Sequence, residues 1–381
     1  MTTNLRDMLV RDTGRGLVQC GAIALVIALL TATTASALSL TPLYSSTLGP
    51  VNNLSIAELQ TNWVVTAAQN ATDNLELTVW NNTGTALVPT SDLNSSTVVT
   101  AVHTTDLDPN RVVTVVINKA TLEMQLDVWL VTLPAGTIVQ QNAPITISGK
   151  ATSVSITTLD SAHVATAAII GGALHVNVFN ISPTGVITKG GGATGGPATE
   201  NASIVTVSPS LVVSAVGNAS KGLEVTAWGI GAGTVTKFGS ATPGLLASKI
   251  EAAYWAPYVV TEFINSNKSL ELMAWSVSGG AVVAQAGGTG GPASPPSTWI
   301  SVVNGPLAPA PITGVIGSGK NLALAAWDSP APTTLATTAT VNLPPTITQV
   351  ALAPDNNAQY FVTATRVSAT GALQVTQWWF H

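Results

Sequence analysis

The chain has 381 residues, of which 46% are hydrophobic and only 8% are charged, and its formal net charge is -5. Charged residues make up about 25% of a typical globular chain. Because this chain has far fewer, uncharged polar residues must provide most of its hydrophilic surface. The negative balance gives no electrostatic basis for a nucleic-acid or anionic-lipid partner. Valine, threonine and isoleucine dominate, which predicts strands rather than disorder.

The N-terminal segment has the pattern of an export signal. Arg6, Arg11 and Arg15 precede the apolar run "CGAIALVIALL", and the following "TATTASA" ends in a small-x-small motif at Ala37. A basic start, a short apolar core and such a site predict a secretory signal peptide over residues 1–37. The alternative is an uncleaved membrane anchor, although the run is shorter than the roughly 18 residues that a spanning helix needs.

A secreted, periplasmic or cell-surface location is therefore expected, with no membrane span in the mature chain, residues 38–381. Cys20 is the only cysteine and lies inside the signal segment. The mature chain would then contain no disulfide, no thiolate metal site and no cysteine nucleophile.

An internal repeat runs through the mature chain. The stretch "LVVSAV" around Ser214 has six related copies, and its Ser or Thr is taken as the anchor of each repeat. The anchors are Thr66, Thr114, Thr166, Ser214, Thr261, Thr313 and Thr363, at steps of 48, 52, 48, 47, 52 and 50 residues. A second landmark, an aromatic residue, follows each anchor at Trp80, Trp129, Phe179, Trp228, Trp275, Trp327 and Trp378. Two landmarks that stay in phase indicate a true repeat.

Each unit also has an apolar run before the anchor, such as "SVSITTL", and another after the aromatic, such as "GVITKG". Four short strands per unit of this length, joined by hairpin-sized connections, are typical of a β-propeller blade. The sequence thus predicts an all-β fold, a seven-bladed β-propeller of four-stranded antiparallel blades that forms one domain over residues 38–381.

The two ends of the mature chain are predicted to meet in one sheet. The chain ends in "LQVTQWWFH", which corresponds to a third strand, so the last repeat lacks its fourth. The segment "LSLTPLYSS" (38–46) precedes the first repeat and is predicted to supply that strand, which removes two open sheet edges. The glycine-rich segments 190–201 and 287–298 are interpreted as loops between blades.

The repeated aromatic is interpreted as a packing wedge between blades, because both faces of a middle strand meet a neighbouring blade. The alternative is a ligand platform repeated by symmetry. Since Phe179 replaces tryptophan in the third repeat, we expect the position to require a flat apolar side chain rather than the indole N–H. The anchor hydroxyl is expected to make a structural hydrogen bond, because a buried hydroxyl needs a partner.

The sequence offers few candidates for catalysis. None of the histidines (His103, His163, His175 and His381) has metal-binding spacing, and no nucleotide or nucleophile motif is present. Asp106 and Asp108 could bind a cation or serve in glycoside chemistry, but carboxylates in "TTDLDPN" are more typical of a turn. No cofactor, metal site or catalytic residue is predicted.

With its "VVTAV" and "L-x-V-x-x-W" landmarks, the chain resembles secreted bacterial propeller-repeat proteins of unassigned function. The resemblance implies the fold and supplies no site residues. Two functions stay open: an exported, non-catalytic binding or scaffold module that acts through loops on one face, and a carbohydrate-binding propeller or glycan-active hydrolase or lyase. The partner would be a protein or a glycan, and the chain is expected to be a monomer.

The signal-peptide interpretation predicts where the exported protein begins. Cleavage after Ala37 leaves Leu38 as the first residue, which N-terminal sequencing of the exported material would detect. A membrane-bound product that retains residues 1–37 would instead show an uncleaved anchor.

Overall fold

The structure is a computed structural model that describes residues 40–292, 301–304, 311–316, 320–331, 334–355 and 360–380. The chain divides into two compact units, Met1–Leu38 and Ser39–His381. The predicted signal peptide, residues 1–37, lies outside the described residues. Those residues contain strands and short connections, and among them there is no helix long and apolar enough to cross a membrane. The prediction of an all-β fold is confirmed.

Strands account for most of the second unit. The first thirteen are β1 (Leu40–Gln60), β2 (Trp63–Asn70), β3 (Asn74–Asn82), β4 (Leu87–Asp108), β5 (Arg111–Asn118), β6 (Met124–Thr132), β7 (Thr137–Gln140), β8 (Ile145–Ile147), β9 (Ala151–Asp160), β10 (His163–Ile170), β11 (Ala173–Ile181), β12 (Ile187–Ser208) and β13 (Leu211–Asn218). They are followed by β14 (Leu223–Gly231), β15 (Thr234–Ala241), β16 (Ala247–Trp255), β17 (Tyr258–Asn265), β18 (Ser269–Ser278), β19 (Ala281–Pro292), β20 (Ser301–Asn304), β21 (Pro311–Ile316), β22 (Asn321–Ala331), β23 (Thr334–Asp355), β24 (Tyr360–Val367) and β25 (Ala372–Phe380).

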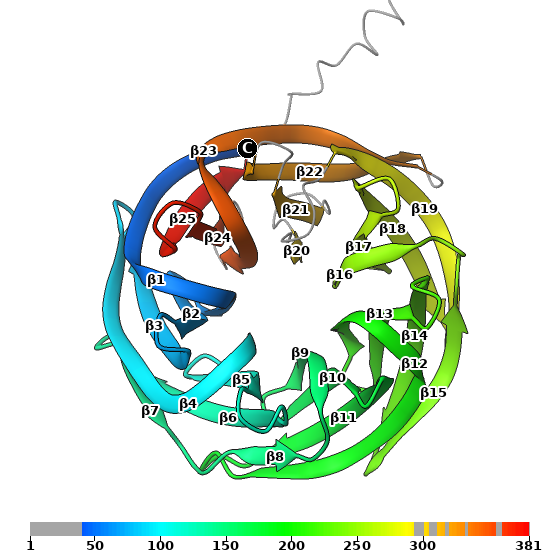
Figure 1. Cartoon of the computed structure of the whole chain (residues 1–381), viewed down its shortest axis with the longest axis horizontal. Coiled ribbons are helices and arrows are strands. Elements are labelled where there is room, and N and C mark those ends of the chain that lie inside the picture. The colour runs from blue at the N-terminus through cyan, green and yellow to red at the C-terminus, as the bar shows by residue number, and fades with distance from the viewer. Residues whose placement is uncertain are drawn as a thin grey trace, which may run out of the picture. The chain divides into compact units, whose positions relative to one another are not determined.

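Consecutive strands of a repeat pair antiparallel, as β9, β10, β11 and β12 do in the third repeat. The anchor lies in the second strand of each repeat and the landmark aromatic in the third. Within the second unit the sheets lie side by side around a common centre, with β9, β16 and β20 close to it and β15 and β19 at the periphery (Figure 1). The N-terminal part of β1 pairs with β25, so the first and last described strands share a sheet.

Some strands belong to two repeats. In β12, residues 187–197 pair with β11 as a fourth strand and residues 198–208 pair with β13 as a first strand. The prediction that 190–201 is a loop is therefore wrong. A Cβ on Gly191 would lie 3.0 Å from the Gly233 backbone, so glycine permits close contact here rather than ending the strand. Residues 287–292 of the second glycine-rich segment also belong to a strand, β19, and 293–298 lie outside the described residues.

Asparagine shapes the turn between the second and third strands. In the first repeat, Asn70 Oδ1 accepts hydrogen bonds from the backbone N–H groups of Thr72 and Asn74, at 2.9 and 3.0 Å. Asp73 then takes a positive φ of 66°, a conformation that Asn and Asp tolerate better than most residues. Asn118, Asn218 and Asn265 cap the equivalent turns.

The landmark aromatics lie between sheets. Trp228 is fully buried in a cluster with Ala165, Val176 and Val178 of the preceding repeat. Trp275 packs in the same way against Val213 and other residues of the fourth repeat. The face of the third strand that carries the aromatic therefore covers the apolar face of the repeat before it.

The six tryptophans at the landmark position also donate hydrogen bonds through their indole N–H groups. In the described part of the chain each donates to the anchor hydroxyl of its own repeat, at 2.8 or 2.9 Å; the pairs are Trp80–Thr66, Trp129–Thr114, Trp228–Ser214, Trp275–Thr261, Trp327–Thr313 and Trp378–Thr363. The expectation that the position requires only a flat apolar ring is therefore wrong. The hydroxyl does make the expected structural hydrogen bond, and the tryptophan is its donor.

The third repeat lacks this hydrogen bond. Phe179 pairs across the sheet with Val164, as Trp228 does with Val212, so the ring occupies the same position. Thr166 Oγ1 is buried without a partner there, and so is Nδ2 of its cross-strand neighbour Asn177. The replacement of tryptophan by phenylalanine thus leaves the buried Thr166 hydroxyl without the N–H donor that the other six anchors have.

A bulge in the fourth strand lies opposite the landmark aromatic. In the third repeat, Phe179 pairs with Lys189 and Val178 with Gly191, so Gly190 is the extra residue. The same register shift occurs in the first, fourth, fifth and sixth repeats among the described strands. In the sheet shared by β25 and β1, Leu43 is the extra residue. Bulges twist and bend the strand that carries them. The fourth strand of each of these sheets is therefore expected to bend at the same position, opposite the landmark aromatic.

A glycine in the turn after the third strand contacts that bulge in the preceding repeat. Gly136 has φ 71°, and a Cβ there would lie 2.1 Å from Oγ1 of Thr90, the bulge residue of the first repeat. Ser91 Oγ donates to the Gly136 carbonyl. Positive φ recurs at Gly84, Gly185, Gly233 and Gly280 in the equivalent turns. Any side chain at Gly136 would be both strained and too close to its neighbour.

The tryptophan–hydroxyl pair predicts opposite outcomes for one substitution in two repeats. Thr166→Val removes a buried hydroxyl without a partner and should raise the free energy of unfolding by about 1 kcal/mol. Thr114→Val leaves the buried Trp129 N–H unpaired and should lower it by about 1–3 kcal/mol. Urea unfolding of both variants measures the two changes. Equal effects in the two repeats would show that the hydrogen bond contributes nothing specific.

Candidate binding site

Two cavities lie at equivalent positions on one face of the second unit. This face, called the hairpin face below, carries the connections between first and second strands and between third and fourth strands. One cavity lies between the third and fourth repeats, and the other between the last and first repeats. Tyr360 and His163 each stand three residues before their anchors, and Trp379 and Asn180 each follow their landmark aromatic. The two pockets thus have equivalent backbone positions but are lined by different side chains.

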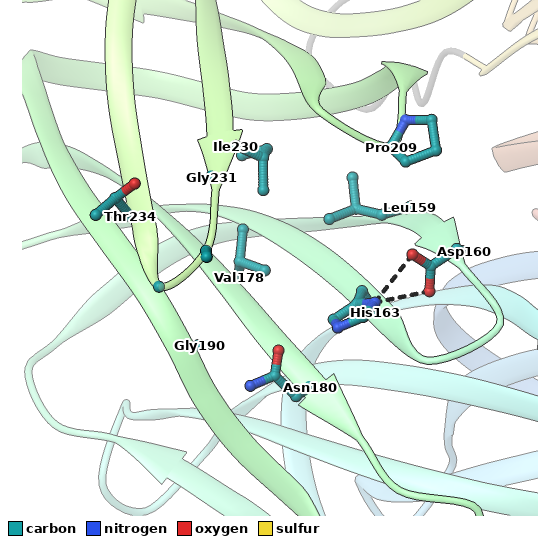
Figure 2. A pocket seen from close by; sticks show the side chains of 12 residues that line it. Leu159, Asp160, His163, Val178, Asn180, Gly190, Pro209, Ile230, Gly231 and Thr234 are labelled. Carbon is teal, nitrogen blue, oxygen red and sulfur yellow. Dashed lines mark hydrogen bonds and ion pairs between the residues drawn. The ribbon is translucent and has the colours of Figure 1, made fainter.

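The cavity between the third and fourth repeats has a volume of about 260 Å³. Leu159, Val178 and Ile230 give it an apolar lining, and the turn of residues 231–234 forms one side (Figure 2). Asn180 and the bulge residue Gly190 lie on another side.

A histidine–aspartate pair lies beside this cavity. His163 Nδ1 is 2.8 and 2.9 Å from the two carboxylate oxygens of Asp160 (Figure 2). Asp160 also accepts the Ala162 N–H at 2.8 Å. These hydrogen bonds outweigh the effect of partial burial and hold the pKa of the Asp160 carboxyl below its usual value. Both side chains are nearly half exposed, so the pair lies in contact with solvent at the rim of the cavity.

Arg111 of the second repeat fixes the turn that carries this pair. Its guanidinium donates to the carbonyls of Ser161 and Ser182, at 3.0 and 2.8 Å, and forms an ion pair of 2.6 Å with Asp108. Asp108 also accepts the Asn110 N–H, as expected for a turn former. Asp108 is the last residue of β4, whereas Asp106 lies two residues inside that strand and away from the turn. The bidentate geometry of arginine suits this link between repeats.

The cavity between the last and first repeats has a volume of about 320 Å³. Three aromatic residues from three strands line it: Tyr44 of β1, Tyr360 of β24 and Trp379 of β25. Its polar lining comes from amide side chains. The other lining residues in the described part of the chain are Leu43, Asn62, Asn82, Gly84 and Gln377, so none of those described is a carboxylate, lysine or arginine.

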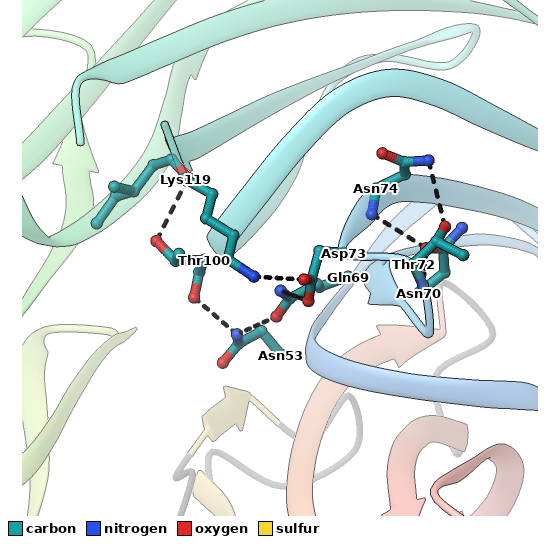
Figure 3. Close-up of polar contacts among 9 residues, drawn as sticks. Asn53, Gln69, Asn70, Thr72, Asp73, Asn74, Thr100 and Lys119 are labelled. Atoms are coloured by element: carbon teal, nitrogen blue, oxygen red, sulfur yellow. Dashed lines mark hydrogen bonds and ion pairs between the residues drawn. The ribbon is translucent and has the colours of Figure 1, made fainter. Parts of the chain in front are cut away.

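The opposite face carries a polar network that joins the first two repeats. Asn53 Nδ2 donates to Gln69 Oε1 and to the Thr100 carbonyl, at 2.8 and 2.7 Å (Figure 3). Gln69 Nε2 donates to Asp73, which also pairs with Lys119. Because each group has its partner within the protein, this network fastens adjacent turns rather than presenting a free site.

The first strands surround a central cavity of about 140 Å³. One equivalent position in these strands supplies six of its lining residues: Ser55, His103, Ser155, Ser203, Glu251 and Ala351. The serines link neighbouring repeats, since Ser55 Oγ accepts the Thr104 N–H at 3.0 Å and Ser203 Oγ accepts the Ala252 N–H at 3.0 Å. Burial lowers the pKa of His103 to about 4, so this ring of side chains contains a neutral imidazole at neutral pH.

Two glutamates oppose each other beside this cavity. Glu251 pairs across β16 and β17 with Glu262, which occupies a position held by Ala or Val in several other repeats. Both oxygens of Glu262 are buried without a hydrogen-bond partner. Burial, and then the charge of Glu251, raise the pKa of Glu262 well above its ordinary value. Burial raises the pKa of Glu251 to about 8, although Ser203 donates to it at 2.9 Å.

The remaining sequence candidates are dispersed. His175 lies in β11 with Nδ1 3.3 Å from Thr194 Oγ1, and His381 lies outside the described residues. Within the described ranges no three His, Cys, Asp or Glu side chains come close enough to hold a metal ion. Sequence reasoning did not find the aromatic pocket, although Tyr360 and Trp379 stand at fixed offsets from the two repeat landmarks.

No family model and no curated protein matches the sequence. Solved structures do match. The chain has a TM-score of 0.53 and 12% identity to Sqt1 of Saccharomyces cerevisiae, over 88% of each chain. The TM-score is 0.56 at 15% identity to a chain of the mitotic checkpoint complex, over 89% of this chain and 94% of that one. For Raptor of Chaetomium thermophilum it is 0.59 at 8% identity, over 88% of this chain but only 28% of that one.

The fold is a β-propeller. These likenesses, together with the all-strand structure and its repeat, confirm that part of the sequence prediction. At such low identity they show the fold alone, and a propeller can serve many functions.

The buried glutamates predict a loss of stability in mildly alkaline solution. A carboxyl whose folded pKa is raised stabilises the fold fully below its unfolded pKa, and this contribution is lost as the pH rises through the folded pKa. For Glu251 that window runs from 4.5 to about 8. Unfolding free energy should therefore fall between about pH 7 and about pH 8. This range lies above the one in which His103 titrates, and above the pKa of about 6 to which burial raises the buried Asp127 of β6.

Glu251→Gln should flatten this decline, because an amide carries no charge to desolvate. Glu123→Gln, in the connection between β5 and β6, is the control and should leave the slope unchanged. Denaturant unfolding at several pH values gives the slopes. A Glu251→Gln variant with the wild-type slope would contradict the assignment.

Proposed function

We propose that this protein is an exported, non-catalytic binding or scaffold propeller that acts through its hairpin face. One observation carries the proposal: the buried positions repeat, while the pocket positions on this face do not. The residue three before the anchor is Trp63, Arg111, His163, Leu211, Tyr258 or Tyr360 in the repeats whose residue is described there. A position that served the fold alone would carry the same type of residue in every repeat, as the buried landmarks do. Different residue types at equivalent pockets are instead typical of ligand recognition.

The proposed architecture is a seven-bladed ring closed by β1. Seven anchors support the number of blades. The antiparallel pairing of β1 with β25, from Leu40–Phe380 to Pro50–Ala372, supports closure through the N-terminal strand. Closure of this kind would remove exposed strand edges and keep the domain monomeric.

Export is proposed from the basic and apolar pattern of residues 1–37. The location would be the periplasm, the cell surface or the medium, where a protein or a glycan is the available partner.

A glycan-active hydrolase or lyase has less support than binding. Glycoside hydrolysis ordinarily needs two carboxyl groups on either side of one bond. Asp160 is the one carboxylate around the cavity between the third and fourth repeats, and none lines the cavity between the last and first. Carbohydrate binding without turnover has support from the aromatic pocket.

Hydrogen exchange tests which face binds. The protein is mixed with the polysaccharide fraction or the protein fraction of a bacterial cell envelope, and amide exchange is followed by mass spectrometry. With one fraction, exchange should slow at the hairpin-face turns 61–62, 83–86 and 232–233. The turns 71–73 and 119–122 on the opposite face are the internal control. No protection with either fraction, protection confined to the control turns, or new reducing ends in the polysaccharide would overturn the proposal.

A further inference from the structure

We propose that the cavity between the last and first repeats binds a neutral carbohydrate ring, held against Tyr360 and Trp379. This inference rests on the proposal that the hairpin face binds ligands, and it names the site and the ligand class. The cavity is formed where β1 joins β25, so residues from both ends of the chain line it.

The aromatic side of the pocket is set by strand register. Tyr360 and Trp379 are directly opposed across β24 and β25, so their side chains lie on the same face of the sheet. That face is the one directed toward the first repeat, because Val362 on the same side packs with Val64 and Trp80. Both aromatic residues are partly exposed, whereas the landmark Trp378 beside them is fully buried.

Tyr44 closes the pocket from the neighbouring strand. It pairs with Gln377, and its hydroxyl donates to the Gly84 carbonyl at 2.7 Å. That hydrogen bond ties β1 to the turn that follows β3, and Gly84 also lines the cavity. The aromatic wall is therefore held in place before any ligand arrives, which lowers the entropy cost of binding.

The polar lining consists of Asn62, Asn82 and Gln377. Asn62 is exposed, whereas Asn82 and Gln377 are buried, and Asn82 Oδ1 accepts the Gly84 N–H at 3.0 Å, so Asn62 is the amide most open to a ligand. An amide side chain presents both a donor and an acceptor. A sugar ring has the matching character, since each hydroxyl both donates and accepts, while its axial C–H bonds form an apolar face that packs on the negative face of an aromatic ring. The cavity of about 320 Å³ is near the lower limit for small-molecule sites, so one or two rings are the expected size.

The charge of the lining argues for a neutral ligand. No carboxylate, lysine or arginine is among the lining residues. A quaternary ammonium ligand would also suit aromatic faces, but the pocket offers no anion to pair with it. An anionic ligand would lack a cation for the same reason.

The cavity between the third and fourth repeats provides a matched comparison. His163 stands where Tyr360 stands, Asn180 where Trp379 stands, and Gly190 where Leu43 stands. The backbone of the two pockets is equivalent, but the second has no tyrosine or tryptophan in its lining. We therefore expect the carbohydrate to select the aromatic pocket.

Tryptophan fluorescence gives a direct readout. Of the tryptophans in the described ranges, Trp379 alone is not buried. The probes are a glycan array and titrations with methyl glycosides of glucose, galactose, mannose and N-acetylglucosamine. At least one should bind saturably and shift the emission. Trp379→Phe should abolish the shift while calorimetry still detects binding, because the aromatic face remains.

Substitutions in the two cavities test which of them binds the carbohydrate. Tyr360→Ala should weaken binding by about tenfold. Asn62→Ala should also weaken it, with some loss of stability because the φ of Asn62 is 69°, a conformation that alanine tolerates less well than asparagine. His163→Ala, the matched control, should leave the affinity unchanged. Thermal melts confirm that each variant is folded.

Two results would overturn the inference: no glycan bound on the array or in titration, or binding that survives Tyr360→Ala and Asn62→Ala or is lost in His163→Ala. Neither affects the wider proposal, which stands if a protein fraction still protects the hairpin-face turns.

Discussion

The buried hydrogen bond from an indole N–H to an anchor hydroxyl is the interaction on which six of the seven repeats depend. It joins the second and third strands of one sheet and lies against the apolar face of the sheet before it, so it is shielded from water. A hydrogen bond in such surroundings costs little to form and much to leave incomplete. In the third repeat the hydroxyl of Thr166 is left unsatisfied beside Phe179, because the indole N–H that would donate to it is missing.

Because the repeated residues are buried, the residues on the hairpin face can differ from one repeat to the next. The bulge opposite each aromatic and the glycine turn of the following repeat define the level at which adjacent sheets touch, as Thr90 and Gly136 show. Residues just beyond that level, such as His163 and Tyr360, point toward the neighbouring repeat without being needed for its core. Pockets therefore form at equivalent places, and their chemistry differs from one to the next.

Around the central cavity, adjacent repeats are joined by a different kind of contact. Serine hydroxyls of the first strands accept backbone N–H groups of the next repeat and so fasten the sheets around the central cavity. The fifth repeat departs from this pattern with Glu251 and Glu262, whose burial favours their neutral forms. This arrangement makes the interior sensitive to alkaline pH at one junction, while the cavities on the hairpin face are formed by other residues.

The sequence by itself determined the all-β class, the repeat and the two landmarks, because strand periodicity and side-chain burial are local properties that recur at fixed spacing. It also located the segment that pairs with β25. It did not reveal that Trp228 donates to Ser214, that residues 190–201 continue a strand, or that Gly84 approaches Tyr44. Each of these depends on contacts between residues from different strands or repeats. The aromatic pocket is the clearest case: Tyr44, Asn62, Tyr360 and Trp379 come from opposite ends of the chain, and only the pairing of β1 with β25 brings them together.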